Sequence, residues 1–194
     1  GSRSLLKFGG IPMKELRADE LTELDLSTQG LGPSEGRLLG GLVAVNASLT
    51  SLKLGGNELC GIDTSGRGTY TLNGIEAIAD ALTVNKSLTS LDISENEIGP
   101  AGGGAIADAL RVNNSLTELD IGYNEIGDAG GVAIGNALSE NVSVNTSRMS
   151  LNLNNNLIGA EGGMALADAL RVNTSLMSLN LNNNLIGAEG GMAL

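Results

Sequence analysis

The chain has 194 residues, of which 41% are hydrophobic, so it has the length and composition of one folded domain and not of a disordered segment. Its 11 basic and 22 acidic residues give a net charge of −11, which argues against nucleic acid and anionic lipid as partners. It contains no apolar run near the ~20 residues of a membrane span, and its single cysteine, Cys60, excludes an intrachain disulfide. We therefore expect an intracellular protein.

Residues 1–20 are predicted to form an N-terminal cap. This segment holds enough apolar side chains to cover one end of the repeat array that begins at Leu21: Leu5, Leu6, Phe8, Ile11, Met13 and Leu16.

From residue 21 to residue 194 the sequence repeats the pattern L-x-x-L-x-L-x-x-N-x-L/I. Six copies are visible, the last of them incomplete, and the spacing is 28 residues except after Leu49 and Leu116, where it is 39 and 32 residues. Residues 144–166 recur as 172–194 with one difference, since Arg148 becomes Leu176. We interpret residues 21–194 as one array of stacked repeats.

Each copy predicts a strand followed by a helix. The L-x-L core alternates as a short strand with one buried face. A glycine-rich turn such as 99–104 is expected next, and then an amphipathic helix such as 101–112. The helix ends at Asn113, for which we expect a left-handed backbone. The predicted fold is an α/β solenoid, a right-handed horseshoe with parallel strands on its concave face and helices on its convex face.

Asparagines recur at one position after the strands, and we expect them to form a structural ladder. Their side chains both donate and accept hydrogen bonds, so they can satisfy backbone groups in a sharp turn. The predicted rungs are Asn57, Asn96, Asn124, Asn156 and Asn184, whereas the first copy departs from the pattern and has Gln29 at this position. Most Asn-x-Ser sequons lie in the return turn after the helices, so we attribute them to backbone geometry and not to glycosylation.

Two irregularities interrupt the repeats. The insertion at residues 60–72 contains Arg67 and Tyr70, two residue types enriched at interfaces, so it is either a functional loop or a neutral expansion. Arg148 occupies a position that should be buried, where an unpaired guanidinium is costly. We expect a local distortion that exposes it.

Catalytic groups are poorly represented in the sequence. The chain has no histidine, so neither a Ser-His-Asp nor a Cys-His set can be assembled. The glycine-rich segments lack the Gly-Lys-Ser/Thr of a phosphate-binding loop. We expect no enzyme activity and no cofactor, and we predict that Asp80, Asp108 and Asp168 solvate a helix surface.

The 28-residue period, the asparagine ladder and the motif Gly-x-x-Ala-Ile/Leu-Ala-Asp-Ala-Leu-x-Val-Asn-x-Ser-Leu resemble ribonuclease-inhibitor-type leucine-rich repeats. The resemblance covers about residues 21–194, and the near-duplicate copies are similar to the large repeat families of single-celled eukaryotes. This class includes NOD-like receptors and Ran GTPase-activating proteins, so the resemblance implies the fold and leaves the function open.

The residues between the strand leucines are expected to face the concave side, where they form an acidic stripe interrupted by one lysine. The predicted binding residues are Asp25, Lys53, Asp92, Glu95, Glu118, Asp120 and Tyr123, with Arg67 and Tyr70 of the insertion as a second candidate site. This pattern favours a scaffold that binds a protein or peptide, and the acidity suggests a basic one. The alternatives are a structural subunit of a larger complex and, by resemblance alone, a GTPase-activating regulator.

Overall fold

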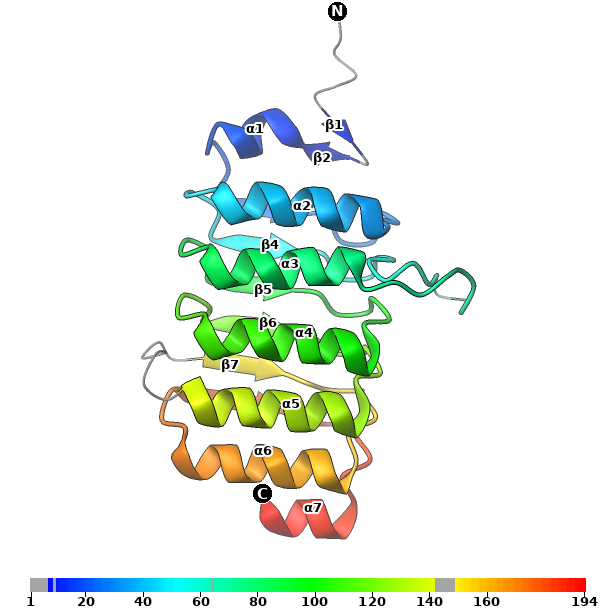
Figure 1. Ribbon diagram of the computed structural model, residues 1–194, viewed down its shortest axis with the longest axis vertical. Helices are drawn as coiled ribbons and strands as arrows, with labels where there is room; N and C mark the ends of the chain where they lie inside the picture. The colour runs from blue at the N-terminus through cyan, green and yellow to red at the C-terminus, as the bar shows by residue number, and fades with distance from the viewer. Residues whose placement is uncertain (1–6, 9, 64, 142–148) are drawn as a thin grey trace, which may run out of the picture.

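The computed structural model describes residues 7–8, 10–63, 65–141 and 149–194, which form a stack of strand-helix coils (Figure 1). The helices lie side by side in one layer, with the strands in a second layer behind them. The helices are α1 (Met13–Arg17), α2 (Pro33–Val45), α3 (Asn73–Val84), α4 (Gly99–Val112), α5 (Gly127–Glu140), α6 (Ala160–Val172) and α7 (Gly187–Ala193). The strands are β1 (Lys7–Phe8), β2 (Ile11–Pro12), β3 (Glu23–Asp25), β4 (Ser51–Lys53), β5 (Ser90–Asp92), β6 (Glu118–Asp120), β7 (Met149–Asn152) and β8 (Leu176–Asn180).

Strands β3 to β8 form one parallel sheet in sequence order, which confirms the predicted α/β solenoid. Equivalent repeat positions pair from strand to strand, so each position forms a column across the sheet. One column points into the core: Leu24, Leu52, Leu91, Leu119, Leu151 and Leu179. The next position forms a polar column on the opposite side: Asp25, Lys53, Asp92, Asp120, Asn152 and Asn180. We call this side of the sheet the strand face.

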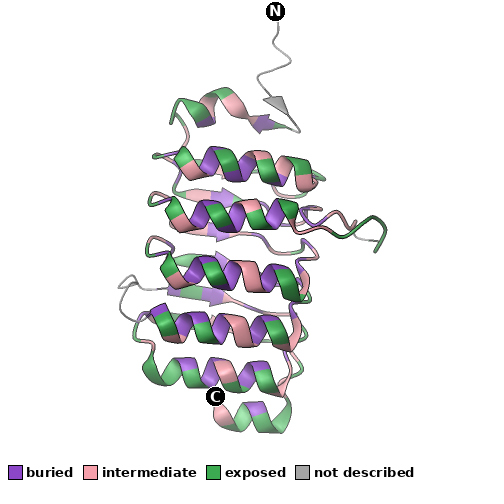
Figure 2. Cartoon of the chain, viewed as in Figure 1, coloured by how far each residue is buried: buried purple, intermediate pink, exposed green. Residues whose placement is uncertain are grey.

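The core lies between the two layers and is built from aliphatic side chains. Leu52 and Leu119 of the sheet are fully buried, as are Ile106 of α4 and Ile134 of α5. Figure 2 shows the resulting alternation of buried and exposed residues along helices α2 to α6. Burial of one such side chain stabilises the folded state by about 1.5–3 kcal/mol. Many repeated aliphatic side chains therefore supply the apolar burial that aromatic residues supply in an ordinary domain.

The expectation for the glycine-rich segments was wrong in part. Helix α4 begins at Gly99 and therefore contains the whole of the segment 99–104 that we expected to precede it as a turn. Gly99 itself has a φ of +64° and supplies the turn. The glycines further along permit close helix packing, since a Cβ on Gly36 of α2 would lie 2.8 Å from the Cα of Gly74 in α3.

The predicted asparagine ladder links neighbouring coils through the backbone. The Oδ1 of Asn57 accepts from the N–H groups of Gln29 and Leu31 in the coil before it, each at 3.0 Å. Its Nδ2 donates to the carbonyls of Leu26 and Leu54 at 2.9 and 2.8 Å. Asn96, Asn124, Asn156 and Asn184 make equivalent bonds in the following coils.

A second asparagine column lies in the return turns, where the expected left-handed conformation was wrong. Asn113 is extended, with φ −72° and ψ 134°. Its Nδ2 donates to the carbonyl of Leu82 at 2.7 Å, and its Oδ1 accepts from the N–H groups of Ser115 and Leu116 at 3.1 and 2.9 Å. The side chain closes the turn and joins two coils, so the backbone does not need a left-handed residue.

The segment before the first repeat packs on the first coil. Ile11 and Leu16 are buried, and the Nδ2 of Asn46 donates to the carbonyl of Leu16 at 2.7 Å. Leu5, Leu6 and the side chain of Phe8 lie outside the described part of the chain. The assignment of residues 1–20 as a cap remains a proposal.

Arg148 lies outside the described residues, but its neighbour Met149 occupies a core position in that coil. Met149 pairs with Leu176 across the sheet, although Leu176 is the sequence counterpart of Arg148. Met149 is 2% exposed, whereas its own counterpart in the next copy, Met177, is 60% exposed. A register shift between β7 and β8 accompanies this exchange.

Candidate protein-binding surface

The strand face is held in place by its own turns. The Oδ1 of Asp92 accepts from the N–H of Ser94 at 2.9 Å, and the Oδ1 of Asp120 accepts from the N–H of Gly122 at 2.9 Å. Asn152 accepts an equivalent bond from the N–H of Asn154. Asp and Asn are suited to this position because their short side chains bond the backbone two residues on.

Asp92 and Asp120 are direct neighbours in the sheet register. The Oδ2 of Asp120 also accepts from the Nδ2 of Asn152 at 2.9 Å, so one carboxylate oxygen is bonded within the face. Glu118 is exposed on the same strand, where its Oε2 accepts from the hydroxyl of Ser90 at 3.0 Å. The middle of the strand face therefore carries three carboxylates on two adjacent strands.

At the start of the sheet, strands β3 and β4 pair an acidic side chain with a basic one. Asp25 is exposed, and the pKa of its carboxyl lies below the usual range because it accepts hydrogen bonds from the backbone and hydroxyl of Ser27. Lys53 on the next strand lies beside Asp25 in the register and lowers this pKa a little further. Lys53 thus separates Asp25 from the acidic pair of Asp92 and Asp120.

Glu95 and Tyr123 do not lie on the strands with the other predicted binding residues. They follow strands β5 and β6 in turns where their φ values are +54° and +56°. Tyr123 is 50% exposed. Both line a cavity of about 530 Å³ together with Glu97, Glu125 and Leu157.

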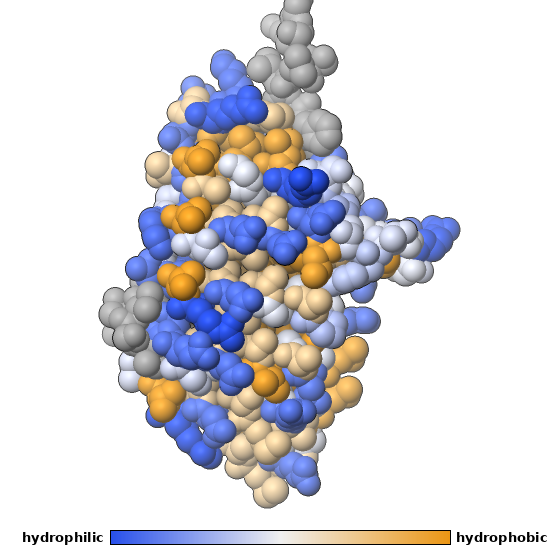
Figure 3. Space-filling model, viewed as in Figure 1, coloured by the Kyte–Doolittle hydropathy of each residue, from blue (hydrophilic) through white to orange (hydrophobic). Residues whose placement is uncertain are grey.

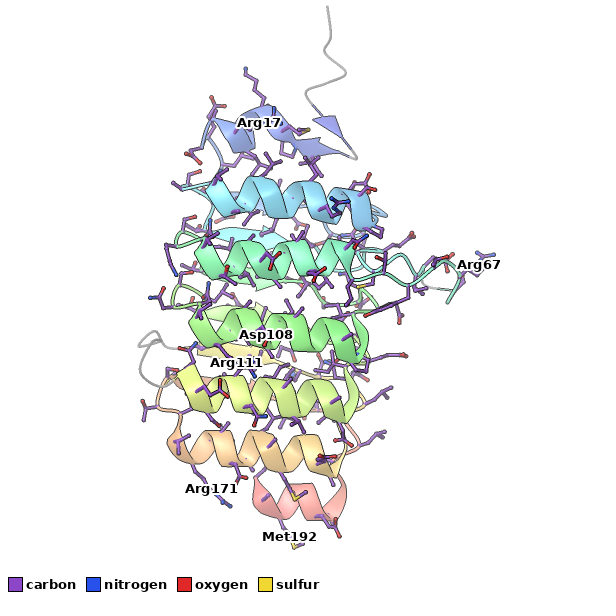
Figure 4. The ribbon with its side chains drawn as sticks, viewed as in Figure 1. Arg17, Arg67, Asp108, Arg111, Arg171 and Met192 are labelled. Atoms are coloured by element: carbon purple, nitrogen blue, oxygen red, sulfur yellow. The ribbon has the colours of Figure 1, made fainter. Side chains whose placement is uncertain are left out.

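The insertion of residues 60–72 is closed at its base and attached to the next coil. The N–H of Thr71 donates to the carbonyl of Cys60 at 2.9 Å. The hydroxyl of Tyr70 donates to the carbonyl of Ile98 at 2.6 Å. Arg67 instead lies at the projecting tip, where its guanidinium contacts Asp63 at 3.4 Å (Figure 4). The structure therefore separates the two residues predicted in the insertion.

A second cavity of about 410 Å³ lies between the insertion and the start of α4. Its lining includes Ile62, Tyr70, Glu97 and Glu125, and three of these, Ile62, Glu97 and Glu125, also line the first cavity. We call the joint depression the side groove, defined by Ile62, Tyr70, Glu95, Glu97, Tyr123 and Glu125. Sequence reasoning found three of these residues and missed Ile62, Glu97 and Glu125. The only available signal was the recurrence of glutamate one residue after the ladder asparagines Asn96 and Asn124.

Burial at the edge of the side groove disfavours the ionised forms of Glu97 and Cys60. It raises the pKa of the Glu97 carboxyl above its ordinary 4.5, and the charge of Glu125 adds to the shift. Burial, followed by the charge of Glu97, raises the pKa of the Cys60 thiol to about 12. Cys60 therefore stays protonated at neutral pH and is not activated as a nucleophile.

The acidic residues of the helix layer behave as solvated surface. Asp108 contacts Arg111 one turn along α4 (Figure 4). Asp168 contacts Arg171 at 3.0 Å on α6. Within the described ranges, no three acidic, cysteine or histidine side chains come together as a metal site. Nor does any helix in those ranges have the length and apolarity to cross a bilayer.

Comparison with known families gives matches in the four last copies of the repeat. Residues 84–107, 112–135, 145–167 and 172–194 each match the family described as Leucine Rich repeat. No curated protein matches the sequence.

Solved structures share the fold, and the leiomodin-1 and tropomodulin structures are two of them. The leiomodin-1 Actin-Binding Site 2 has a TM-score of 0.60 at 19% identity, over 96% of this chain and 85% of that chain. The tropomodulin C-terminal domain of Caenorhabditis elegans has a TM-score of 0.59 at 16% identity, over 82% of this chain and 89% of that chain. At these identities the similarity concerns the fold alone.

Proposed function

This chain is a leucine-rich-repeat protein, and from that premise we propose that it is a non-catalytic scaffold that binds a protein partner on its strand face. The observation that carries the proposal is the register of the sheet, in which Asp92 lies directly beside Asp120. Two like charges are therefore neighbours on adjacent strands of the strand face. Like charges at this spacing cost energy that a cationic partner relieves.

The strand face is suited to binding because its side chains are already positioned. The turn bonds of Asp92 and Asp120 fix both carboxylates before a partner arrives, which lowers the entropy lost on association. The opposite side of the molecule is covered by helices α2 to α7, and we call it the helix face. It offers a different surface, since Figure 3 shows its strongly hydrophobic residues as separate patches among hydrophilic ones.

Other features of the molecule fit a scaffold inside the cell. The chain has no histidine, and the buried Cys60 thiol has a pKa of about 12, so the usual nucleophiles and bases are not supplied. An intracellular location belongs to the proposal because a free, buried cysteine is stable in a reducing compartment.

The test is the double variant Asp92→Asn/Asp120→Asn. Asn152 and Asn180 hold the same repeat position and accept the same turn bond, each at 3.1 Å, so the variant keeps the turn bonds. Besides the two charges, it removes only the bond that Oδ2 of Asp120 accepts from Asn152. A partner captured by the wild-type chain is expected to bind the variant about tenfold more weakly, with a smaller salt dependence.

The matched control is Glu76→Gln/Asp80→Asn, which removes the same charge from exposed positions of α3. It is expected to bind as the wild type does. Equal affinity of both double variants for the partner would exclude the strand face as the binding surface.

A second candidate function is attachment to actin as a subunit of a larger assembly. The observation that favours it is the similarity in fold to the leiomodin-1 Actin-Binding Site 2. Sedimentation with filamentous actin and titration of monomeric actin test it directly. Binding to neither form would remove this candidate and leave the scaffold proposal standing.

A further inference from the structure

The side groove combines negative charge with exposed apolar surface. Its carboxylates come from Glu95, Glu97 and Glu125, and its rings come from Tyr70 and Tyr123, which are 43% and 50% exposed. The side chain of Leu157, 48% exposed, extends the apolar surface towards the next coil. The two parts of this surface come from different elements, because Tyr70 belongs to the insertion and Tyr123 to the turn after β6.

The negative charge in the groove has no internal counter-ion. None of the residues that line the two cavities is a lysine or an arginine. In the part of the chain that the structure describes, the ion pairs form elsewhere, between Arg67 and Asp63 and on the helix face. A cation from outside the chain is the group that this arrangement lacks.

We propose that the side groove binds an arginine side chain of a partner peptide, with the guanidinium between the carboxylates of Glu97 and Glu125 and against the ring of Tyr123. Arginine fits better than lysine because its planar guanidinium bonds a carboxylate through two N–H groups and stacks on an aromatic face. The aliphatic stem and a neighbouring apolar residue of the peptide would lie along Ile62 and Leu157. This inference rests on the proposed scaffold function and assigns it a second contact, beyond the strand face.

The insertion has a defined part in this site. Its Tyr70 hydroxyl bonds the carbonyl of Ile98, so the loop that carries Ile62 is fixed beside Glu97 at the start of α4. Burial and the charge of Glu125 raise the pKa of Glu97, so the pair of carboxylates is destabilised when both are ionised. A bound guanidinium would reverse that effect and favour the ionised form.

The direct test uses three short peptides of one sequence, N-acetyl-Gly-Leu-X-Leu-Gly-amide, in which X is arginine, citrulline or glutamate. Citrulline has nearly the shape of arginine and no charge. Amide chemical shifts of the full chain are measured as each peptide is added. The arginine peptide is expected to shift the resonances of Glu97, Tyr123 and Glu125, and the citrulline peptide is expected to bind about tenfold more weakly.

Two variants locate the contact. Glu97→Gln/Glu125→Gln removes the charge, and because the charged pair is itself unfavourable, the variant is expected to stay folded. Tyr123→Asn removes the ring and keeps a residue type that Asn155 and Asn183 already show at the same left-handed position. Each is expected to weaken the arginine peptide about tenfold, whereas the helix-face control Glu76→Gln/Asp80→Asn should bind it unchanged.

The outcomes separate this inference from the proposed function. Failure of the arginine peptide to bind, or equal binding of the citrulline peptide, overturns the arginine site while partner binding to the strand face is unaffected. Loss of peptide binding in the groove variants supports the arginine site whatever the strand-face variant does. If Asp92→Asn/Asp120→Asn leaves partner binding unchanged, the strand-face proposal fails and the arginine site is unaffected.

Discussion

The side-chain oxygen of Asn124 accepts a hydrogen bond from the backbone N–H of Asn96, 2.8 Å away in the preceding coil. Its Nδ2 donates back to the carbonyl of Ile93 in that coil at 3.0 Å. One buried amide therefore supplies both a donor and an acceptor to the same neighbour. The coils are joined by polar bonds at their edge as well as by the strands and the apolar core.

Substitution Asn124→Leu is expected to destabilise the chain. It removes the partners of buried backbone groups in two coils, which costs about 1–3 kcal/mol in free energy of unfolding for each unsatisfied group. Urea unfolding should show a lower midpoint. The control Asn136→Ala, at an exposed position of α5, should not lower the midpoint. An unchanged midpoint in Asn124→Leu would mean that the ladder does not contribute to stability.

The return-turn asparagines are expected to matter for structure and not as sequons. Asn113→Ala and Ser115→Ala both destroy the same Asn-x-Ser sequence. Only the first removes the bonds to Leu82, Ser115 and Leu116, so it should lower the free energy of unfolding by about 1–3 kcal/mol. Ser115→Ala removes only the longer hydroxyl bonds, at 3.3 and 3.4 Å, and should lower it less. Thermal unfolding of both variants measures the difference, and equal loss in the two would contradict the assignment.

Substitution Tyr70→Phe is expected to loosen the insertion without unfolding the chain. It removes the 2.6 Å bond to the carbonyl of Ile98, worth about 0.5–1.5 kcal/mol. Arg67 is the only lysine or arginine among residues 60–72, so trypsin cleavage after Arg67 reports on this segment alone. Cleavage should be faster in Tyr70→Phe and unchanged in the control Tyr123→Phe. Equal rates in all three proteins would show that Tyr70 does not hold the insertion.

The raised pKa of Glu97 predicts the direction of a pH effect. A carboxyl whose pKa is higher in the folded state than its ordinary 4.5 contributes stability below 4.5 and loses it as pH rises through the folded value. Glu97→Gln should therefore be more stable than the wild type at neutral pH, with the difference disappearing in acid. Urea unfolding across this range measures it. The difference should shrink when Glu125→Gln is also present, because the charge of Glu125 is the second cause of the shift.

The periodic part of the fold was predictable from the sequence, and the non-periodic part was not. Leu91 and Leu119 recur with the spacing of a strand with one buried face, so their burial and register followed from the repeat. The side groove depends on how the insertion folds back to bring Tyr70 onto Ile98, a contact that no repeat encodes.

Backbone conformation explains why two candidate residues, Glu95 and Tyr123, lie in the side groove and not in line with the strands. Glu95 and Tyr123 adopt positive φ, which the L-x-L pattern does not indicate for residues other than glycine. Their side chains consequently leave the line of the strands and enter the side groove, together with Glu97 and Glu125.

The glycines that bring neighbouring helices together, as Gly131 and Gly162 do for α5 and α6, also affect the opposite side of the molecule. Strands in a sheet lie ~4.8 Å apart whatever their side chains, whereas packed helices lie about 8–10 Å apart, so each coil is a wedge and the stack bends around its sheet. A Cβ on Gly131 would lie 3.1 Å from the Cα of Gly162, so these glycines thin the wide edge of each wedge. They thereby set the radius of curvature of the solenoid. Alanine at Gly131 would push the two helices apart, increase the curvature of the solenoid and draw the two ends of the strand face towards each other. The size of partner that fits the strand face would change, although no residue of the strand face would be altered.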